Sequence, residues 1–174
     1  MSASRESVVT WVNFQQTGRV IQSLLEERLQ AETDLSLPEF EVLWRLEHAA
    51  EEPMQMSDIA EQVLGSPSGI TRMADRLEGD GLITRETPHD NRRVVHARLT
   101  AKGVSVLGRA RRVFGEALDD AFSAHLSDSD VSALRRLLRT LLEANGAWVD
   151  SRCNPAFATG PAKAPVVPAP RGRR

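Results

Sequence analysis

Cysteine is almost absent from this chain of 174 residues, because Cys153 is the only one. A single thiol cannot form an intrachain disulfide, and it excludes a thiolate-rich metal site. We expect Cys153 to be inert, with an intermolecular bridge or a reactive thiol as the alternative. The histidines do not favour a zinc site either, because no two of them are four positions apart on one helix. They are His48, His89, His96 and His125. We therefore expect no metal and no cofactor.

Long apolar runs are also lacking. No stretch approaches the roughly 18 apolar residues of a membrane span, and residues 1–10 lack the basic region followed by an apolar run that is typical of a signal peptide. We therefore expect a soluble protein of the cytoplasm. The length suits one compact unit with a tail.

Signatures of catalysis are missing as well. The sequence offers no nucleophile with a neighbouring base and no paired carboxylate, and the glycine-containing segment 65–69 lacks the lysine that a phosphate-binding loop requires. We expect the protein not to be an enzyme.

Charge is unevenly distributed along the chain. The formal net charge is −2, which by itself does not favour nucleic acid. Residues 1–62 hold four arginines against twelve acidic residues, whereas residues 66–112 hold ten basic residues against five acidic ones. A local basic region of this kind suits DNA, since specific binding depends on the local field.

Helical spacing of apolar residues predicts helices over about 6–32 and 37–49, and two more after Thr100 and Ser127. Ser36 and Glu39 have the spacing of a capping box at the start of the second helix. Thr100 and Ser127 are expected to be N-caps, and the last helix could extend to Trp148 and Val149.

The segment from Ser57 to Arg98 predicts a helix-turn-helix followed by a hairpin. Ser57 is a candidate N-cap for a short helix, which Gly65 would end. Ser66 and Pro67 then restart the chain as N-cap and first helical residue. Two helices joined by so short a turn must cross at a large angle.

The helix from Ser66 to about Glu78 has two distinct faces. Its inner face is apolar and consists of Ile70, Met73, Ala74 and Leu77. Opposite it lie Ser68, Arg72 and Asp75, with Thr71 and Arg76 at the flanks. These hydroxyls and arginines suit phosphates and guanine edges. Asp75 lies among them and could pair with Arg72 or Arg76, or accept from a cytosine amino group.

Two β-rich runs, 82–86 and 94–99, flank a polar loop and predict a hairpin. Arg92 and Arg93 would lie at its tip, where a narrow minor groove attracts arginine, and Asp90 could hold one guanidinium in place. The alternative is a solubilising loop.

The first and the last two helices carry more apolar surface than one small domain can bury, which predicts a two-fold dimer. From Asn154 the chain is rich in Pro, Ala and Gly and ends in a basic cluster, which indicates a disordered tail with an optional nonspecific contact to DNA. The expected fold class is mainly α with a small β-wing: a winged helix-turn-helix plus a helical dimerisation region.

Five segments in register resemble the MarR family of bacterial transcriptional regulators. They are 36–43, 71–78, Gly81-Leu82-Ile83, Asp90-Asn91-Arg92-Arg93 and Leu99-Thr100-Ala101-Lys102-Gly103. The resemblance covers about Val8 to Val149. It implies a homodimer that binds a palindromic operator, often as a repressor, and that a small aromatic or anionic ligand releases.

The resemblance also implies residue roles. Together with the face analysis it gives a DNA-binding set: Ser66, Ser68, Thr71, Arg72, Arg76, Asp90, Arg92 and Arg93. Urate-sensing relatives suggest a ligand set of Trp11, Glu41, Arg72 and Arg85, although Glu41 stands where they have aspartate. Trp44 is added as a tryptophan that could line a ligand crevice. Core or interface positions are the alternative for the tryptophans. No cysteine lies in the N-terminal helix, so thiol switching is not expected.

The expected division has four parts. They are a dimerisation helix in 1–34, a DNA-binding domain in 35–100, C-terminal dimerisation helices in 101–150 and a tail in 151–174. The expected partners are duplex DNA, a second copy and a small-molecule effector, and no membrane. A second hypothesis is a winged-helix dimer that acts as a scaffold for proteins and does not bind DNA.

Overall fold

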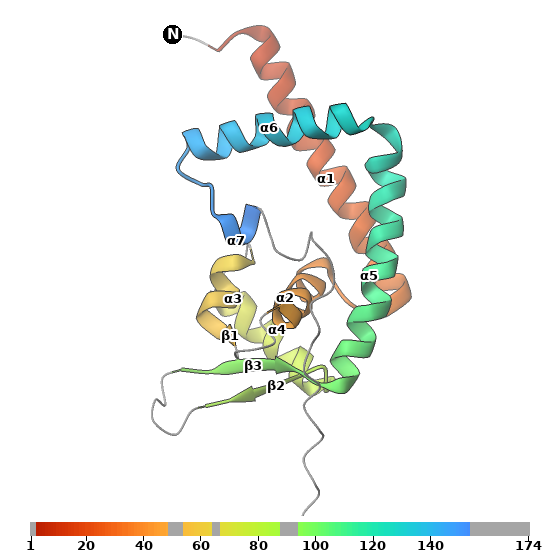
Figure 1. Cartoon of the computed structure of the whole chain (residues 1–174), viewed down its shortest axis with the longest axis vertical. Coiled ribbons are helices and arrows are strands. Elements are labelled where there is room, and N and C mark those ends of the chain that lie inside the picture. Colours follow the sequence, from red (N-terminus) through yellow and green to blue (C-terminus); the bar gives the residue numbers. More distant parts are fainter. Residues whose placement is uncertain (1–2, 49–53, 64–66, 88–93, 154–174) are drawn as a thin grey trace, which may run out of the picture.

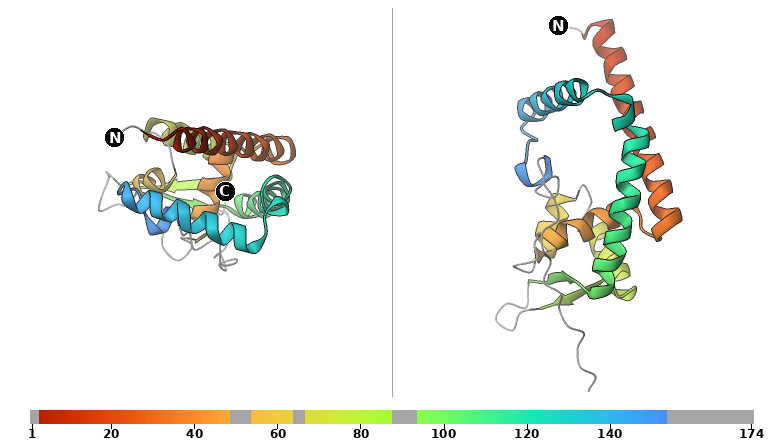
Figure 2. Two further views of the ribbon diagram at one scale, coloured as in Figure 1. Left: turned by 90° about the horizontal axis from the view of Figure 1, so that it is seen from above. Right: turned by 45° about the vertical axis from the view of Figure 1, so that its right-hand side comes forward.

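The computed structural model describes residues 3–48, 54–63, 67–87 and 94–153, without the side chains of 60–62, 67, 68, 151 and 152. Helices α1 (Arg5–Thr33) and α5 (Ala101–Ala121) run side by side (Figures 1 and 2). The smaller elements gather at the end of this pair where α5 begins. Helix α6 (Asp128–Ala144) follows the other end of α5 and runs away from it (Figures 1 and 2). The predicted fold class is confirmed.

Helix α2 (Leu37–His48) begins at the predicted capping box. The backbone N–H and the hydroxyl of Ser36 donate to Glu39 Oε2, each over 2.8 Å, and Glu39 N–H donates back to Ser36 Oγ over 3.4 Å. Glu26 of α1 accepts from the N–H of Leu37 over 2.6 Å. Helix α1 ends at Thr33, and its C-cap Asp34 has a left-handed φ of 59°, so the chain turns sharply between the two helices.

The helix-turn-helix contains α3 (Met56–Gln62) and α4 (Pro67–Gly79). Pro67 opens α4, as predicted. The N-cap of α3 is Gln55 and not Ser57, because Met54 and Gln55 form a strand, β1, that leads directly into the helix. Strand pairing therefore takes precedence over the local capping preference of serine. The predicted turn residues Gly65 and Ser66 lie outside the described residues.

Helix α4 ends in a glycine motif. Gly81 has φ 69°, its N–H donates to the carbonyl of Glu78 over 2.9 Å, and the N–H of Leu82 donates to the carbonyl of Leu77 over 2.8 Å. The chain then enters β2 (Ile83–Glu86), which pairs antiparallel with β3 (His96–Leu99). The described sheet has the order β1-β3-β2. The hairpin prediction is confirmed for the strands.

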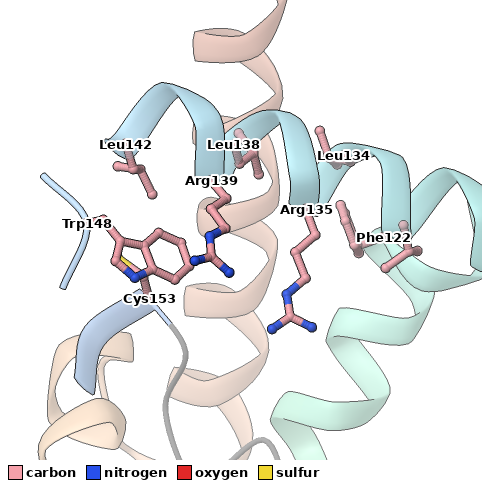
Figure 3. Close-up of a pocket in the computed structure, with 9 residues that line it drawn as sticks. Phe122, Leu134, Arg135, Leu138, Arg139, Leu142, Trp148 and Cys153 are labelled. Carbon is pink, nitrogen blue, oxygen red and sulfur yellow. The ribbon is translucent and has the colours of Figure 1, made fainter. Parts of the chain in front are cut away.

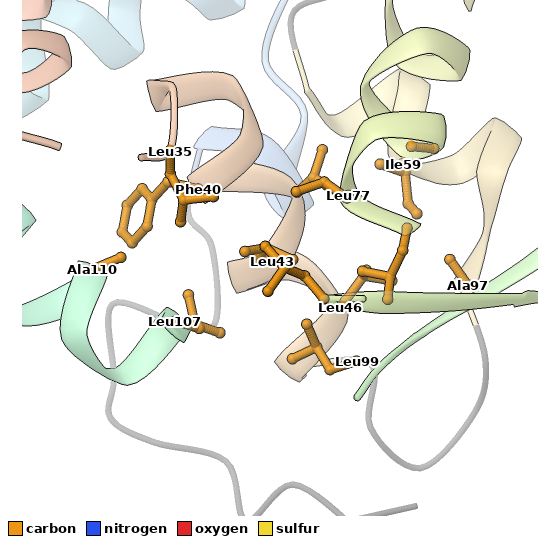
Figure 4. Close-up of a cluster of buried hydrophobic side chains, with 14 of the residues drawn as sticks. Leu35, Phe40, Leu43, Leu46, Ile59, Leu77, Ala97, Leu99, Leu107 and Ala110 are labelled. Carbon is orange, nitrogen blue, oxygen red and sulfur yellow. The ribbon is translucent and has the colours of Figure 1, made fainter. Parts of the chain in front are cut away.

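One core connects the elements around α2, as Figure 4 shows for side chains from α2, α3, α4, the sheet and α5. Ile70, Ala74 and Leu77 of α4 are at most 3% exposed, and Met73 is partly buried against the same core, so the predicted inner face is confirmed. On the opposite side of α2, Leu107 and Ala110 of α5 are fully buried. The core thus holds α4 in place by one face only.

Helix α5 begins directly after the sheet. Thr100 is its N-cap, as predicted, and accepts from Gly103 N–H over 2.9 Å. Thr100 also donates its N–H to Leu82 O over 3.0 Å and its hydroxyl to Gly81 O over 2.7 Å. These bonds lock the start of α5 to the turn after α4.

Helix α6 begins at the predicted N-cap Ser127, in a capping box with Asp130. It ends at Ala144 and does not continue to Trp148, because Gly146 adopts φ 64° and turns the chain. A short helix, α7 (Asp150–Cys153), follows, so residues 151–153 of the predicted tail are helical. Residues 154–174 lie outside the described residues.

Candidate nucleic-acid interface

Helix α4 presents a polar face away from the core. Thr71 and Arg72 are exposed, and the side chain of Asp75, one turn after Arg72, is 57% exposed. Within the described part of the chain Arg72 forms no ion pair, so its guanidinium is available for a partner. The predicted outer face of α4 therefore presents donors to solvent beside the sheet. The side chain of Ser68 lies outside the described residues.

The hairpin formed by β2 and β3 lies next to α4 (Figure 1). Its register pairs Ile83 with Leu99 and Glu86 with His96. The loop that contains Asp90, Arg92 and Arg93 lies outside the described residues, and so does Ser66. The described part of the interface therefore consists of α4 and the two strands.

Arg76, the fourth predicted DNA contact on α4, has a side chain that is 51% exposed and that contacts three groups of the protein. Its Nη2 donates to the carbonyl of Asp34 over 3.0 Å, its Nη1 lies 3.3 Å from Glu39 Oε1, and its Nε lies 3.7 Å from Asp80 Oδ2. The Glu39 side chain is only 4% exposed. Arg76 therefore joins α4 to the turn between α1 and α2. Sequence spacing did not reveal this role, because Asp34 and Glu39 are about 40 positions away.

Arg85 of β2 is bound to α4. Its Nε and Nη2 donate to Glu78 Oε2 over 2.9 and 2.6 Å, and its backbone N–H donates to Glu78 Oε1 over 3.0 Å. Its Nη2 also lies 2.7 Å from Asp75 Oδ1. Asp75 is thus paired with Arg85, so the alternative in which it pairs with Arg72 or Arg76 is wrong. These hydrogen bonds lower the pKa of Glu78 and raise that of Arg85.

The predicted ligand residues do not meet in one protomer. Trp11 is 56% exposed in the first half of α1 and contacts Phe14, with ring centroids 6.1 Å apart. That end of α1 lies far from α2 (Figure 1). Glu41 lies on α2, where burial raises the pKa of its carboxyl although the Arg45 guanidinium opposes the shift. Arg85 is bound to α4, as described above.

Trp44 belongs to an aromatic cluster between α2 and α5. Its ring centroid lies 4.9 Å from that of Phe40 and 5.6 Å from that of Phe114, and Phe40 stacks on Phe114 at 4.8 Å. Trp44 therefore packs against the core, which was the alternative to a role in ligand binding. Nearby, Glu47 of α2, 4% exposed, accepts from Arg111 Nη1 of α5 over 2.5 Å. This ion pair is a second connection between the two helices that sequence spacing did not reveal.

No three His, Cys, Asp or Glu side chains gather into a possible metal site among the residues that the structure describes. A search of the same residues for a helix long and apolar enough to cross a membrane found none.

A helix-turn-helix whose second helix is exposed on one face, followed by a β-hairpin, defines a winged-helix protein. The sequence model of the MarR family matches residues 35–95. The chain is 32% identical to the transcriptional repressor IacR of Pseudomonas putida over 125 residues, which are 71% of each protein. It is 30% identical to the transcriptional regulator MhqR of Bacillus subtilis over 105 residues, 60% of this chain and 70% of that protein.

Solved structures show the same fold. AbsC, a MarR family regulator from Streptomyces coelicolor, superposes with a TM-score of 0.77 at 23% identity, over 85% of this chain and 99% of that one. Sco3205 from the same organism, solved in complex with DNA, gives 0.75 at 22% identity, over 83% and 90%.

The protein belongs to the MarR family. It is therefore a DNA-binding transcriptional regulator and not an enzyme.

Proposed function

We propose that the protein is a homodimeric repressor that binds a palindromic operator and leaves it when a small aromatic or anionic ligand binds. In this proposal the outer face of α4 enters the major groove, with Ser66, Ser68, Thr71 and Arg72 at the DNA. The loop with Asp90, Arg92 and Arg93 reaches the neighbouring minor groove.

The exposed outer face of α4 is the observation that carries this proposal. Its inner face is buried and its N-terminal half presents Thr71 and Arg72 to solvent, which is the orientation that a groove-reading helix needs. We assign Arg76 to positioning α4, since its guanidinium faces Asp34, Glu39 and Asp80.

Apolar surface on α1 and α6 supports the homodimer. Helix α6 has no buried residue although it spans 17 positions, and Leu137 and Leu141 are 54% and 58% exposed. Its other leucines, Leu134, Leu138 and Leu142, line a groove of about 320 Å³ that has Phe122 at one end and Trp148 at the other (Figure 3). The first half of α1 exposes a further set: Val8, Val9, Trp11, Val12 and Phe14. A second copy would remove these surfaces from water.

In the proposed dimer each segment of the chain has its own role. Segments 1–34 and 101–150 dimerise, 35–100 binds DNA, and the basic tail in 151–174 adds an optional nonspecific contact. Two α4 helices related by two-fold symmetry read two half-sites about one helical turn apart, which predicts an inverted repeat. We expect this to take place in the cytoplasm.

One relative supports the repressor role, and one structural neighbour supports a small-molecule effector. IacR is named as a repressor, and the organohalide-sensing regulator RdhR was solved with 2,4-dichlorophenol bound. For this chain we propose a small aromatic or anionic effector. Glu41, Trp44, Arg72, Arg85 and Trp11, the last from either protomer, are the residues to test for its binding.

Selection from a random-sequence duplex library tests the DNA-binding part of the proposal. The protein should enrich an inverted repeat, and Arg72→Ala should weaken binding to it by roughly 1–3 kcal/mol and relax the sequence preference. Failure to retain any duplex at low salt would favour the protein scaffold instead.

Sedimentation of the purified protein tests the dimer. Leu141→Glu should shift the dimer toward monomer, because a buried leucine contributes about 1.5–3 kcal/mol. Thr140→Glu, at the neighbouring exposed position, is the matched control. A wild-type monomer at micromolar concentration would contradict the proposal.

A further inference from the structure

Arg85 lies at the junction between the hairpin and α4. Its guanidinium contacts carboxylates on consecutive turns of the helix, with Nη2 2.6 Å from Glu78 Oε2 and 2.7 Å from Asp75 Oδ1. The backbone N–H of Arg85 is also bound to Glu78. Side chain and main chain of one strand residue thus fix the hairpin to the helix.

Asp75 places a negative charge on the outer face of α4, which is the face proposed to bind DNA. It follows Arg72 by three positions, so the two side chains lie about 60° apart on the helix, on the face directed away from the core. DNA is densely and negatively charged, and a carboxylate on this face repels its phosphates. The Arg85 guanidinium, 25% exposed, lies against this carboxylate on the side of the hairpin.

We propose that Arg85 is a positioning residue for DNA binding that masks the charge of Asp75 and holds the hairpin at a fixed place beside α4. This inference rests on the proposed function and adds a specific claim to it. Arg85 acts through Asp75 and Glu78 and does not itself contact DNA.

Two other roles make different predictions. If Arg85 bound a phosphate directly, its loss would weaken binding regardless of Asp75 and would reduce the salt slope of the affinity by about one. If Arg85 only stabilised the fold, its loss would lower the melting temperature and leave the affinity of the folded protein unchanged.

A double-mutant cycle separates these roles, with Asp75→Asn, Arg85→Met and the double variant. The probe is a fluorescent duplex that the wild-type protein selects from a random library, titrated by anisotropy at several NaCl concentrations. Arg112→Met is the matched control, since it also removes one cation from an ion pair, with Glu116, but lies on α5. Circular dichroism confirms that each variant is folded.

If Arg85 masks the charge of Asp75, the effects of Arg85→Met and Asp75→Asn on DNA affinity should be strongly coupled. Asp75→Asn alone should change the affinity by less than about twofold, because its charge is already neutralised. Arg85→Met should weaken binding about tenfold at low salt, and adding Asp75→Asn should recover most of that loss. Arg112→Met should match the wild type within about twofold.

Several results would overturn the proposal. Additive effects within the cycle, or an unchanged affinity of Arg85→Met, would each do so. If Arg85→Met does not fold, Asp75→Asn decides, since a fivefold gain in affinity would reveal an unmasked acid. A wild-type protein that binds no duplex refutes the proposed function as well, whereas binding without coupling refutes this inference alone.

Discussion

Gly103 lies where helix α5 approaches the turn after α4 most closely. A Cβ at this position would be 2.0 Å from the carbonyl oxygen of Leu82 and 3.2 Å from Leu99 Cδ2. Carbon and oxygen need about 3.3 Å, so alanine would force a displacement of roughly 1.3 Å. The displaced oxygen is the one that accepts from the Thr100 N–H. Gly103→Ala thus affects both packing and the hydrogen bonds of this junction.

The expected cost of Gly103→Ala follows from three contributions. Overpacking costs about 1–3 kcal/mol and a lost hydrogen bond about 1 kcal/mol, while alanine returns about 1 kcal/mol of helix propensity. Thr100 donates hydrogen bonds to two carbonyls of the turn, those of Gly81 and Leu82. If both connections are lost, the free energy of unfolding should fall by about 2–4 kcal/mol in total. The melting temperature should fall by roughly 5–12 °C.

Gly108 provides a matched control on the same helix. It is exposed, and a Cβ there would meet nothing within 4 Å, so Gly108→Ala should be neutral or stabilise the protein by up to about 1 kcal/mol. Thermal unfolding at one fixed protein concentration compares the two variants. Equal melting temperatures for Gly103→Ala and Gly108→Ala would refute the packing argument.

Two further predictions concern helix α2. Arg111→Met leaves the buried Glu47 carboxylate without this cation and should cost about 1–3 kcal/mol in urea unfolding, whereas Arg112→Met removes only an exposed pair and should cost under about 1 kcal/mol. Equal urea midpoints for the two variants would contradict a role for the pair. Burial raises the pKa of Glu41, so its ionisation opposes folding as the pH rises through the interval between the unfolded and folded pKa values. Glu41→Gln should therefore stabilise the protein at neutral pH, with a gain that fades toward about pH 4, and a gain that does not change with pH would exclude this cause.

Local signals are sufficient to predict much of the fold. Ser36, Thr100 and Ser127 cap the helices that the sequence predicts they cap, because a capping hydroxyl and its amide lie only three residues apart. The inner face of α4 is also predictable, since helical periodicity places its apolar residues together. The prediction of Ser57 as an N-cap is wrong, because pairing of Met54 with Ala97 involves residues 43 positions apart.

The candidate site is harder to predict than the fold. The sequence pattern assigns Arg72 and Arg76 to the second helix of the motif and Arg85 to the first strand of the hairpin, as the structure has them, but it does not identify their partners. Whether an arginine faces DNA, a ligand or a neighbouring carboxylate depends on which acidic residues the fold brings near it. Glu39 illustrates this, because its carboxylate serves the capping box of α2 and also contacts Arg76 of α4.

A single residue, Thr100, separates the last residue of the sheet from the first turn of α5. The junction is held rigidly, because the same threonine donates hydrogen bonds to the carbonyls of Gly81 and Leu82. Helix α5 is about 30 Å long, so a tilt of only 5° about its far end swings the hairpin end by roughly 2.6 Å. A small tilt of α5 about its far end therefore moves the hairpin directly, because no flexible linker lies between the helix and the hairpin.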